Sequence, residues 1–177
     1  MIQIHFIINP IAGSGNHKID QTFLESLFSK DEYHISTKYS NYKTHTTELA
    51  KKSISEKADI IVACGGDGTI NEVASCIIGT PILLGIIPLG SGNGLASNLN
   101  IPKKLAKAIS IIKKRKVRII DVGVLNGNYF FSNAGVGFDA YVIKNYEESN
   151  NRKFLSYIKA FFKSFKNIND TRIIEVT

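Results

Sequence analysis

The 177-residue chain contains no tryptophan, one methionine, four prolines and two cysteines. Cys64 and Cys76 belong to no C-x-x-C pair and to no patterned set with histidine, which argues against a disulfide framework and a zinc site. We interpret both as small buried residues. The four histidines lack metal-ligand spacing and form no Ser-His-Asp set, so the sequence favours neither hydrolytic nor zinc chemistry.

Long hydrophobic runs are also missing. The longest apolar segments, such as residues 82–87, have the length of a strand and fall far short of the roughly 20 residues of a membrane-spanning helix. The N-terminus, Met-Ile-Gln-Ile-His, lacks the basic region of a signal peptide. We therefore expect a cytoplasmic protein. With 44% hydrophobic residues, the chain can bury a packed core.

A glycine-rich turn, Gly-Gly-Asp-Gly-Thr (residues 65–69), follows apolar residues 60–63 and precedes a helical pattern over residues 70–78. Backbone N–H groups and a helix N-terminus at such a turn favour a bound phosphate. A carboxylate beside a triphosphate repels it unless a divalent cation lies between them or the carboxylate takes a proton. Asp67 therefore indicates Mg-nucleotide chemistry. Because no Gly-Lys-Ser/Thr sequence occurs, a Walker A loop is excluded.

Two further segments share this organisation. Asn-Pro-Ile-Ala-Gly-Ser-Gly (residues 9–15) and Pro-Leu-Gly-Ser-Gly-Asn-Gly (residues 88–94) each follow an apolar segment and precede a helical pattern. One such turn alone is typical of a tight connection. Since turns after parallel strands emerge at the same edge of a sheet, we expect the three loops to line one crevice.

Helical patterns alternate with strand-like segments through the first 114 residues. The predicted strands are residues 2–8, 33–39, 59–63 and 83–87, and the further helices are residues 18–29, 44–55 and 103–114. This alternation predicts an α/β fold with a doubly wound, mostly parallel sheet in residues 1–121. Asn126-Gly127 between the apolar segments 118–124 and 129–131 is a hairpin signal. We therefore expect residues 122–177 to begin a β-rich second domain.

The three loops, with Asn71-Glu72 extending the loop at residues 65–69, resemble the nucleotide-binding half of the diacylglycerol kinase and sphingosine kinase-like lipid kinases. NAD kinases share the Gly-Gly-Asp-Gly-Thr turn and the Asn-Glu pair. The other two loops and residues 133–139, Asn-Ala-Gly-Val-Gly-Phe-Asp, favour the lipid kinases. The resemblance runs along nearly the whole chain and implies the fold shared by NAD kinases and diacylglycerol kinases.

This resemblance implies transfer of the γ-phosphoryl group of ATP to the hydroxyl of a diacylglycerol-like lipid, with Mg²⁺ as the second cofactor. Asp67 is the implied catalytic carboxylate, and the metal ligands are otherwise left open. The implied nucleotide-binding residues are Asn9, Pro10, Ile11, Ala12, Gly13, Ser40, Gly66, Asp67, Gly68, Thr69, Ile70, Asn71, Glu72, Ser91 and Asn93. No motif fixes the alignment of Ser40.

The Asp67 turn also has a purely structural interpretation. Asp67 or Thr69 could cap the helix that follows, and Thr69 is the better candidate. Thr69 and Glu72 form the Thr-x-x-Glu pattern of a capping box, which would give Glu72 a local role only. Asn71 and Glu72 are therefore weaker candidates than Asp67.

In the resembling enzymes, a later β-rich domain completes the lipid cleft and supplies a carboxylate general base. Residues 172–176 read as a strand of that domain, so we expect the chain to be an N-terminal fragment of a lipid kinase. The alternatives are an NAD kinase and a nucleotide-binding module without catalysis.

The net charge of +7 is concentrated in two clusters, within residues 103–118 and 152–166. In the second, aromatic and aliphatic residues recur at helical spacing from Phe154 to Phe165, which is typical of a helix that lies on an anionic membrane. We expect a transient membrane contact at the inner face, or packing of this helix against the β-rich domain. No nucleic-acid motif accompanies the charge. The sequence leaves a homo-oligomer open.

Overall fold

The computed structural model describes residues 1–15, 17–42 and 44–132, which belong to one compact unit, Met1–Ser132. The predicted aromatic helix at 154–165, the strand at 172–176 and residues 133–139 lie outside the described residues. The expected domain boundary after Asp121 stays a prediction.

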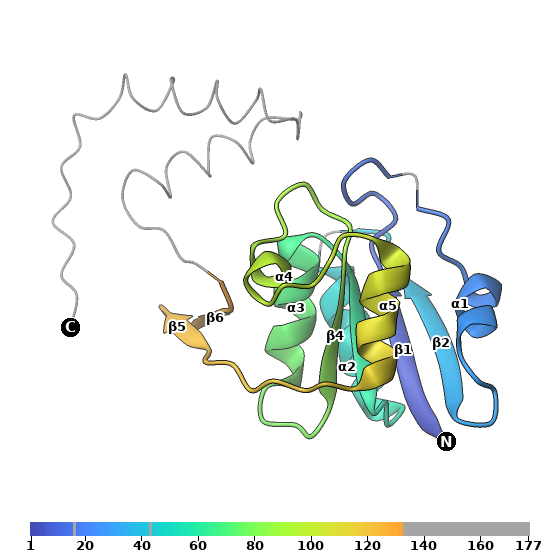
Figure 1. The fold of residues 1–177 in the computed structure, drawn as a ribbon. Helices are drawn as coiled ribbons and strands as arrows, with labels where there is room; N and C mark the ends of the chain where they lie inside the picture. Colours follow the sequence, from blue (N-terminus) through green and yellow to red (C-terminus); the bar gives the residue numbers. More distant parts are fainter. Residues whose placement is uncertain (16, 43, 133–177) are drawn as a thin grey trace, which may run out of the picture. The chain divides into compact units, whose positions relative to one another are not determined.

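Four parallel strands form the central sheet in the order β2-β1-β3-β4 (Figure 1). The strands are β1 (Ile2–Ile8), β2 (Tyr33–Tyr39), β3 (Ile60–Gly65) and β4 (Leu83–Pro88). The helices are α1 (Gln21–Leu27), α2 (His45–Ser55), α3 (Asp67–Ile77), α4 (Gly94–Asn98) and α5 (Leu105–Lys114). These elements confirm the predicted α/β fold with a parallel sheet.

Each face of the sheet carries its own apolar core. Alternate residues of β1 separate onto the two faces, because successive side chains of a strand point in opposite directions. Ile4, Phe6 and Ile8 pack with side chains of α1 and α5. Ile7 packs instead with side chains of α2, α3 and α4. The sheet is therefore covered on both faces, as the near-continuous apolar strands predict.

A separate two-stranded antiparallel sheet follows α5. Strands β5 (Gly123–Leu125) and β6 (Asn128–Phe130) pair across Asn126 and Gly127, both of which have positive φ. The Asn-Gly hairpin prediction is thus confirmed. The first strand is shorter than predicted, since residues 118–122 are neither helix nor strand.

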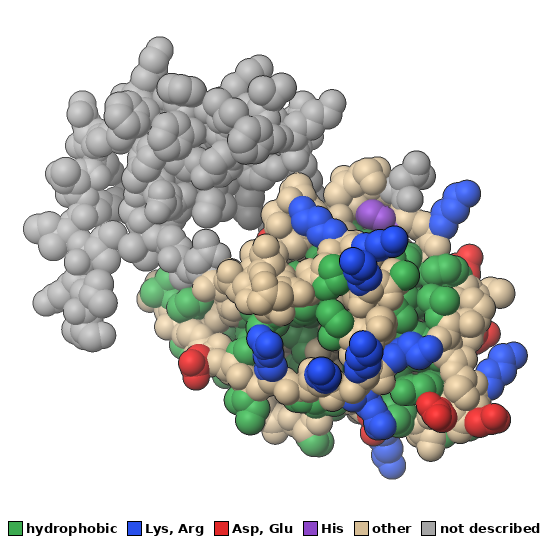
Figure 2. All heavy atoms as spheres, viewed as in Figure 1, with side chains coloured by type: hydrophobic (Ala, Val, Ile, Leu, Met, Phe, Trp, Pro, Cys, Tyr) green, Lys and Arg blue, Asp and Glu red, His purple; other side chains and the backbone are tan. Residues whose placement is uncertain are grey.

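The first basic cluster lies on the outer side of α5 and the segment after it. Figure 2 shows lysine and arginine side chains gathered over the face where α5 lies. The exposed members are Lys103, Lys104, Lys107, Lys113, Lys114, Arg115, Lys116 and Arg118. Ala108, Ile109 and Ile112 fill the inner face of the same helix. No helix of the described residues is long and apolar enough to cross a bilayer.

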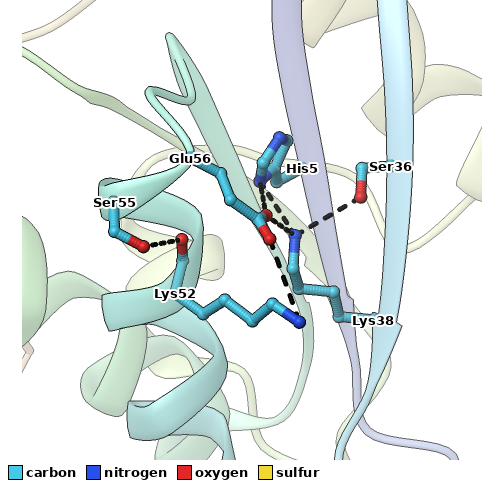
Figure 3. Close-up of polar contacts among 6 residues, drawn as sticks. All are labelled: His5, Ser36, Lys38, Lys52, Ser55 and Glu56. Atoms are coloured by element: carbon cyan, nitrogen blue, oxygen red, sulfur yellow. Dashed lines mark hydrogen bonds and ion pairs between the residues drawn. The ribbon is translucent and has the colours of Figure 1, made fainter.

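A partly buried polar cluster lies between β1, β2 and the end of α2, and its Glu56 carboxylate is exposed (Figure 3). Lys38 Nζ lies 2.8 Å from Glu56 Oε2, and it donates hydrogen bonds to His5 Nδ1 at 3.0 Å and to Ser36 Oγ at 3.3 Å. His5 is 4% exposed. Because Nδ1 accepts a hydrogen bond from the lysine ammonium, which can only donate, this nitrogen carries no proton and the imidazole is neutral.

Burial, with the nearby ammonium of Lys38, lowers the pKa of His5 below its ordinary value of 6.5, although the Glu56 carboxylate opposes this shift. The hydrogen bond from Lys38 lowers the pKa of Glu56. Both shifts have the same consequence. As the pH falls, the unfolded chain takes up these protons before the folded chain does, so acid weakens the fold.

We predict that the free energy of unfolding falls from about pH 7.5 to about pH 5.5 and that His5→Asn flattens this slope. Asparagine removes the titrating ring but keeps an oxygen that can accept from Lys38. Urea denaturation across this range measures the effect. The control is His34→Asn, which removes an exposed histidine on β2 whose charge makes the smallest of the contributions to the lowered pKa of His5. An unchanged slope in His5→Asn would contradict the prediction.

Candidate nucleotide-binding site

The order of the strands places the loops that follow β1 and β3 at a point where the winding of the sheet reverses. The chain moves from β1 outward to β2, then returns past β1 to β3 and continues to β4. The helix after β1 covers one face, and the helix after β3 covers the other. The backbone segments that leave the carboxyl ends of β1 and β3 therefore run toward opposite faces of the sheet. This is the position at which open α/β sheets bind ligands.

Backbone hydrogen bonds tie the loop starts together along this edge. Asn9 N donates to Cys64 O at 2.9 Å, and Leu89 N donates to Gly65 O at 2.8 Å. Ser40 N donates to Ile8 O at 2.9 Å, so the end of β2 joins the same row. The structure thus brings the starts of all three loops, and Ser40, to one edge of the sheet.

Glycine allows these loops to touch through their backbones. A Cβ on Gly13, which has φ +58°, would lie 2.2 Å from the carbonyl oxygen of Leu89. A Cβ on Gly90 would lie 2.5 Å from the Cα of Gly66. The first loop (residues 9–15) therefore packs on the third loop (residues 88–94). The third loop also packs on the second loop (residues 65–69). No side chain could occupy either contact without moving the backbone.

The second loop leads directly into helix α3, whose N-cap is Gly66. The first bond of the helix runs from Ile70 N to Gly66 O at 3.1 Å. The N–H groups of Asp67, Gly68 and Thr69 consequently have no acceptor within the helix. Asp67 and Gly68 are exposed. The first turn of α3 therefore offers an anion a positive helix end and backbone donors that no described residue occupies.

The predicted capping roles in this turn are wrong. Neither Asp67 nor Thr69 is the N-cap, and no side chain caps the helix. Thr69 is the third helical residue; its buried side chain packs against Gly65, and Oγ1 accepts a hydrogen bond from Asn9 Nδ2 at 3.2 Å. Glu72 Oε2 is buried without a hydrogen-bond partner among the described residues. Thr69 and Glu72 thus form no capping box.

The third loop contacts the carboxylate of Asp67 directly. Asn93 N donates to Asp67 Oδ2 at 2.8 Å, which is the one hydrogen bond that the described residues give this side chain. A Cβ on Gly92 would lie 3.0 Å from Oδ2, and one on Gly94 would lie 3.7 Å from Oδ1. The two glycines therefore leave space on both sides of the carboxylate.

The remaining predicted residues differ in their surroundings. Pro10, Ile11, Gly13 and Ser91 are exposed, whereas Ala12, Ser40 and Ile70 are buried and Asn71 is half-buried. Ile11 N donates to Asn9 Oδ1 at 3.2 Å, so Asn9 uses both ends of its amide within the site. Ser91 and Asp67 therefore present exposed polar side chains at the site, and the ligand contacts assigned to all of these residues stay predictions.

Two residues at the site were not among the predicted contacts. Gly90 forms the close contact with Gly66, and its place in a Gly-x-Gly run was a usable signal. Ser132 follows β6, and its Oγ would lie 2.9 Å from a Cβ on Gly94, beside the space around Asp67. No sequence pattern linked Ser132 to the loops, because an antiparallel hairpin positions it.

A cavity of about 690 Å³ lies elsewhere, beside β4. Its walls are mainly aliphatic side chains from the end of α3, from α5 and from residues 115–122. None of residues 9–15, 65–72 or 88–94 lines it. The candidate site is therefore an open surface at the strand ends rather than this apolar cavity.

Comparison with known proteins agrees with this geometry. The model of the diacylglycerol kinase catalytic domain family matches residues 3–125. This match covers more than half of the chain, so the chain belongs to the diacylglycerol kinase catalytic domain family, a family of lipid kinases.

Individual relatives are longer than this chain. A diacylglycerol kinase of Bacillus subtilis is 34% identical over 140 residues, covering 77% of this chain and 46% of that protein. An uncharacterized protein of Synechocystis sp. is 31% identical over 169 residues, covering 88% of this chain and 39% of that protein. The crystal structure of a diacylglycerol kinase from Bacillus anthracis matches with a TM-score of 0.58 and 27% identity, covering 72% of this chain and 47% of that one. The chain thus spans less than half the length of these relatives.

We predict that Gly90→Ala lowers the free energy of unfolding by about 1–3 kcal/mol, because the new methyl group must displace the backbone at Gly66. Gly68→Ala is the matched control, since no atom lies within 4 Å of a Cβ there. Alanine in the first turn of α3 should leave the stability unchanged or raise it slightly. Chemical denaturation compares the two variants, and equal stabilities would argue against close packing of the second and third loops.

Proposed function

We propose that the chain binds Mg-ATP at the ends of β1, β3 and β4 and serves transfer of the γ-phosphoryl group to the hydroxyl of a diacylglycerol-like lipid at a membrane surface. The observation that carries the proposal is the exposed carboxylate of Asp67 at the first turn of α3, beside free backbone donors. The donors suit phosphate oxygens, and the carboxylate suits a cation bound to them.

The residues present fit a magnesium ion that arrives with its nucleotide. Asp67 Oδ1 accepts no hydrogen bond from the described residues, and the glycines at 92 and 94 leave space beside it. No group of three or more His, Cys, Asp or Glu side chains gathers in the described part of the chain. One carboxylate plus phosphate oxygens is a usual arrangement for Mg²⁺, which keeps several of its waters. When bound, the ion would neutralise charge on the transferring phosphoryl group.

The chain itself contributes positioning in this proposal. Backbone N–H groups of Gly68 and Thr69 hold phosphate oxygens, and Asn9 fixes the first loop on α3 through Thr69. Ser91 reaches the nucleotide from the third loop. Phosphoryl transfer needs little covalent chemistry from protein, so orientation and charge placement supply most of the rate enhancement.

We predict opposite effects of Asp67→Asn on ATP affinity with and without Mg²⁺. With Mg²⁺, the variant should bind ATP about tenfold more weakly, because it loses the charge that faces the cation. In EDTA, it should bind ATP at least as tightly as the original chain, because the carboxylate no longer repels the triphosphate. Titration calorimetry measures both affinities.

The control for this prediction is Asp31→Asn, which makes the same charge change in an exposed turn before β2, at the opposite edge of the sheet. It should alter neither affinity measurably. If Asp67→Asn weakened ATP binding equally with Mg²⁺ and with EDTA, Asp67 would not act through a cation.

Transfer of labelled phosphate from Mg-ATP tests the reaction itself, with diacylglycerol in mixed micelles and NAD offered in parallel. Label in the lipid from this chain, and none from Asp67→Asn, would establish a lipid kinase and would overturn the expectation that the general base of a later domain is needed. Label in NAD would identify the chain as an NAD kinase. ATP binding without label in either acceptor would agree with a fragment or with a module that binds nucleotide without catalysis, and the same assay on a longer protein that contains this chain would separate the two.

A further inference from the structure

Asn93 is the most deeply buried polar residue of the three loops. Its side chain is buried, with 1% of the residue exposed, and its backbone is left-handed with φ 62°. The side-chain oxygen accepts from Gly90 N at 2.9 Å, and the side-chain nitrogen donates to Gly90 O. Its carbonyl oxygen accepts from Ser97 N at 2.9 Å.

The remaining polar group of Asn93 is its backbone N–H, which donates to Asp67 Oδ2. Every polar atom of Asn93 therefore already has a partner within the protein. A side chain that is turned into its own loop and buried there cannot reach a nucleotide on the surface. This differs from the expectation that Asn93 itself contacts the cofactor.

We propose that Asn93 is a positioning residue, which folds the third loop so that its own N–H holds one carboxylate oxygen of Asp67 and leaves the other oxygen for the cation. This inference rests on the proposed function of Asp67. Asparagine suits the place for two reasons. It tolerates left-handed backbone better than other residues with a side chain, and its amide can pair with both the N–H and the carbonyl of one residue.

The two hydrogen bonds to Gly90 set the direction of the Asn93 N–H. They close residues 90–93 into a tight loop, and Gly90 in turn packs on the backbone of Gly66. Gly66 immediately precedes Asp67. The loop thus contacts the second loop twice, once at its backbone and once at the carboxylate. Without the side-chain amide, the N–H would remain but its orientation would not be fixed.

The test compares Asn93→Gly with Asn100→Gly. Glycine keeps the left-handed backbone and the N–H at both positions, so neither variant is strained. Asn100 is also an asparagine in left-handed backbone, with φ 56°, but it is exposed and forms no hydrogen bond with the three loops. Asp67→Ala removes the acceptor of the Asn93 N–H. Because Asp67 is exposed at a helix start, this variant should fold.

The first readout needs no nucleotide. Hydrogen exchange, followed by NMR, reports whether the amide of residue 93 is protected. We expect Asp67→Ala to speed exchange of the Asn93 amide about tenfold or more, and Asn100→Gly to leave it unchanged. Exchange at residue 93 that does not respond to Asp67→Ala would overturn the proposal, whether or not the chain binds ATP.

The second readout is the Mg²⁺ dependence of ATP affinity, taken as the ratio of dissociation constants in EDTA and in Mg²⁺. Asn93→Gly should lower this ratio about 3- to 10-fold in the original chain and leave it unchanged in Asp67→Ala, because the effect passes through Asp67. A merely structural role would lower the ratio equally in both backgrounds, and that result would refute the inference. Absence of ATP binding would instead refute the proposed function, and the exchange measurement would still decide the role of Asn93.

Discussion

The backbone hydrogen bond from Asn9 N to Cys64 O joins the ends of β1 and β3 and holds the candidate site together. The chain leaves β1 for the face that carries α1 and α5, and it leaves β3 for the face that carries α2 and α3. The backbone segments that follow β1 and β3 diverge at this point. Without hydrogen bonds between them, the polar groups of these two loops would separate. Asn9 prevents this, since its backbone N–H bonds to Cys64 O and its amide bonds to Thr69 Oγ1. The start of α3 is thereby fixed relative to the first loop, and the free donors of its first turn take a defined place.

The sequence predicts the parts of this site better than their connections. Each loop carries glycines after an apolar strand, and such turns are recognisable because few other residues accept their backbone geometry. The strand order is not readable from the sequence, because pairing is set by contacts between segments far apart in the chain. The reversal between β1 and β3 therefore emerges only in the structure, although the α/β class follows from the alternation of patterns.

Thr69 shows why a correct motif can lead to a wrong role. The Thr-x-x-Glu spacing satisfies the local rule for a capping box, but a local rule does not include the neighbouring strand. Gly65 has no side chain, so the Thr69 side chain packs against its backbone, and Asn9 reaches across from β1 to bond with it. The helix consequently begins three residues earlier, at Asp67 rather than at residue 70, with a glycine as its N-cap. Tertiary packing thus replaces the cap and places Asp67, rather than Thr69, at the exposed start of the helix.

The scarcity of carboxylates at this edge determines how a cation could be held there. Among residues 9–15, 65–72 and 88–94, only Asp67 and Glu72 are acidic, and Glu72 has a buried oxygen. A single exposed carboxylate cannot replace enough of the tightly held water of Mg²⁺ to bind it strongly alone. Phosphate oxygens must supply further ligands, so the nucleotide and the cation would bind as coupled partners. By thermodynamic linkage, each must then raise the affinity for the other by the same factor. Under the proposed function, the position of the Asp67 carboxylate, which accepts a hydrogen bond from the third loop, would contribute to the size of that factor.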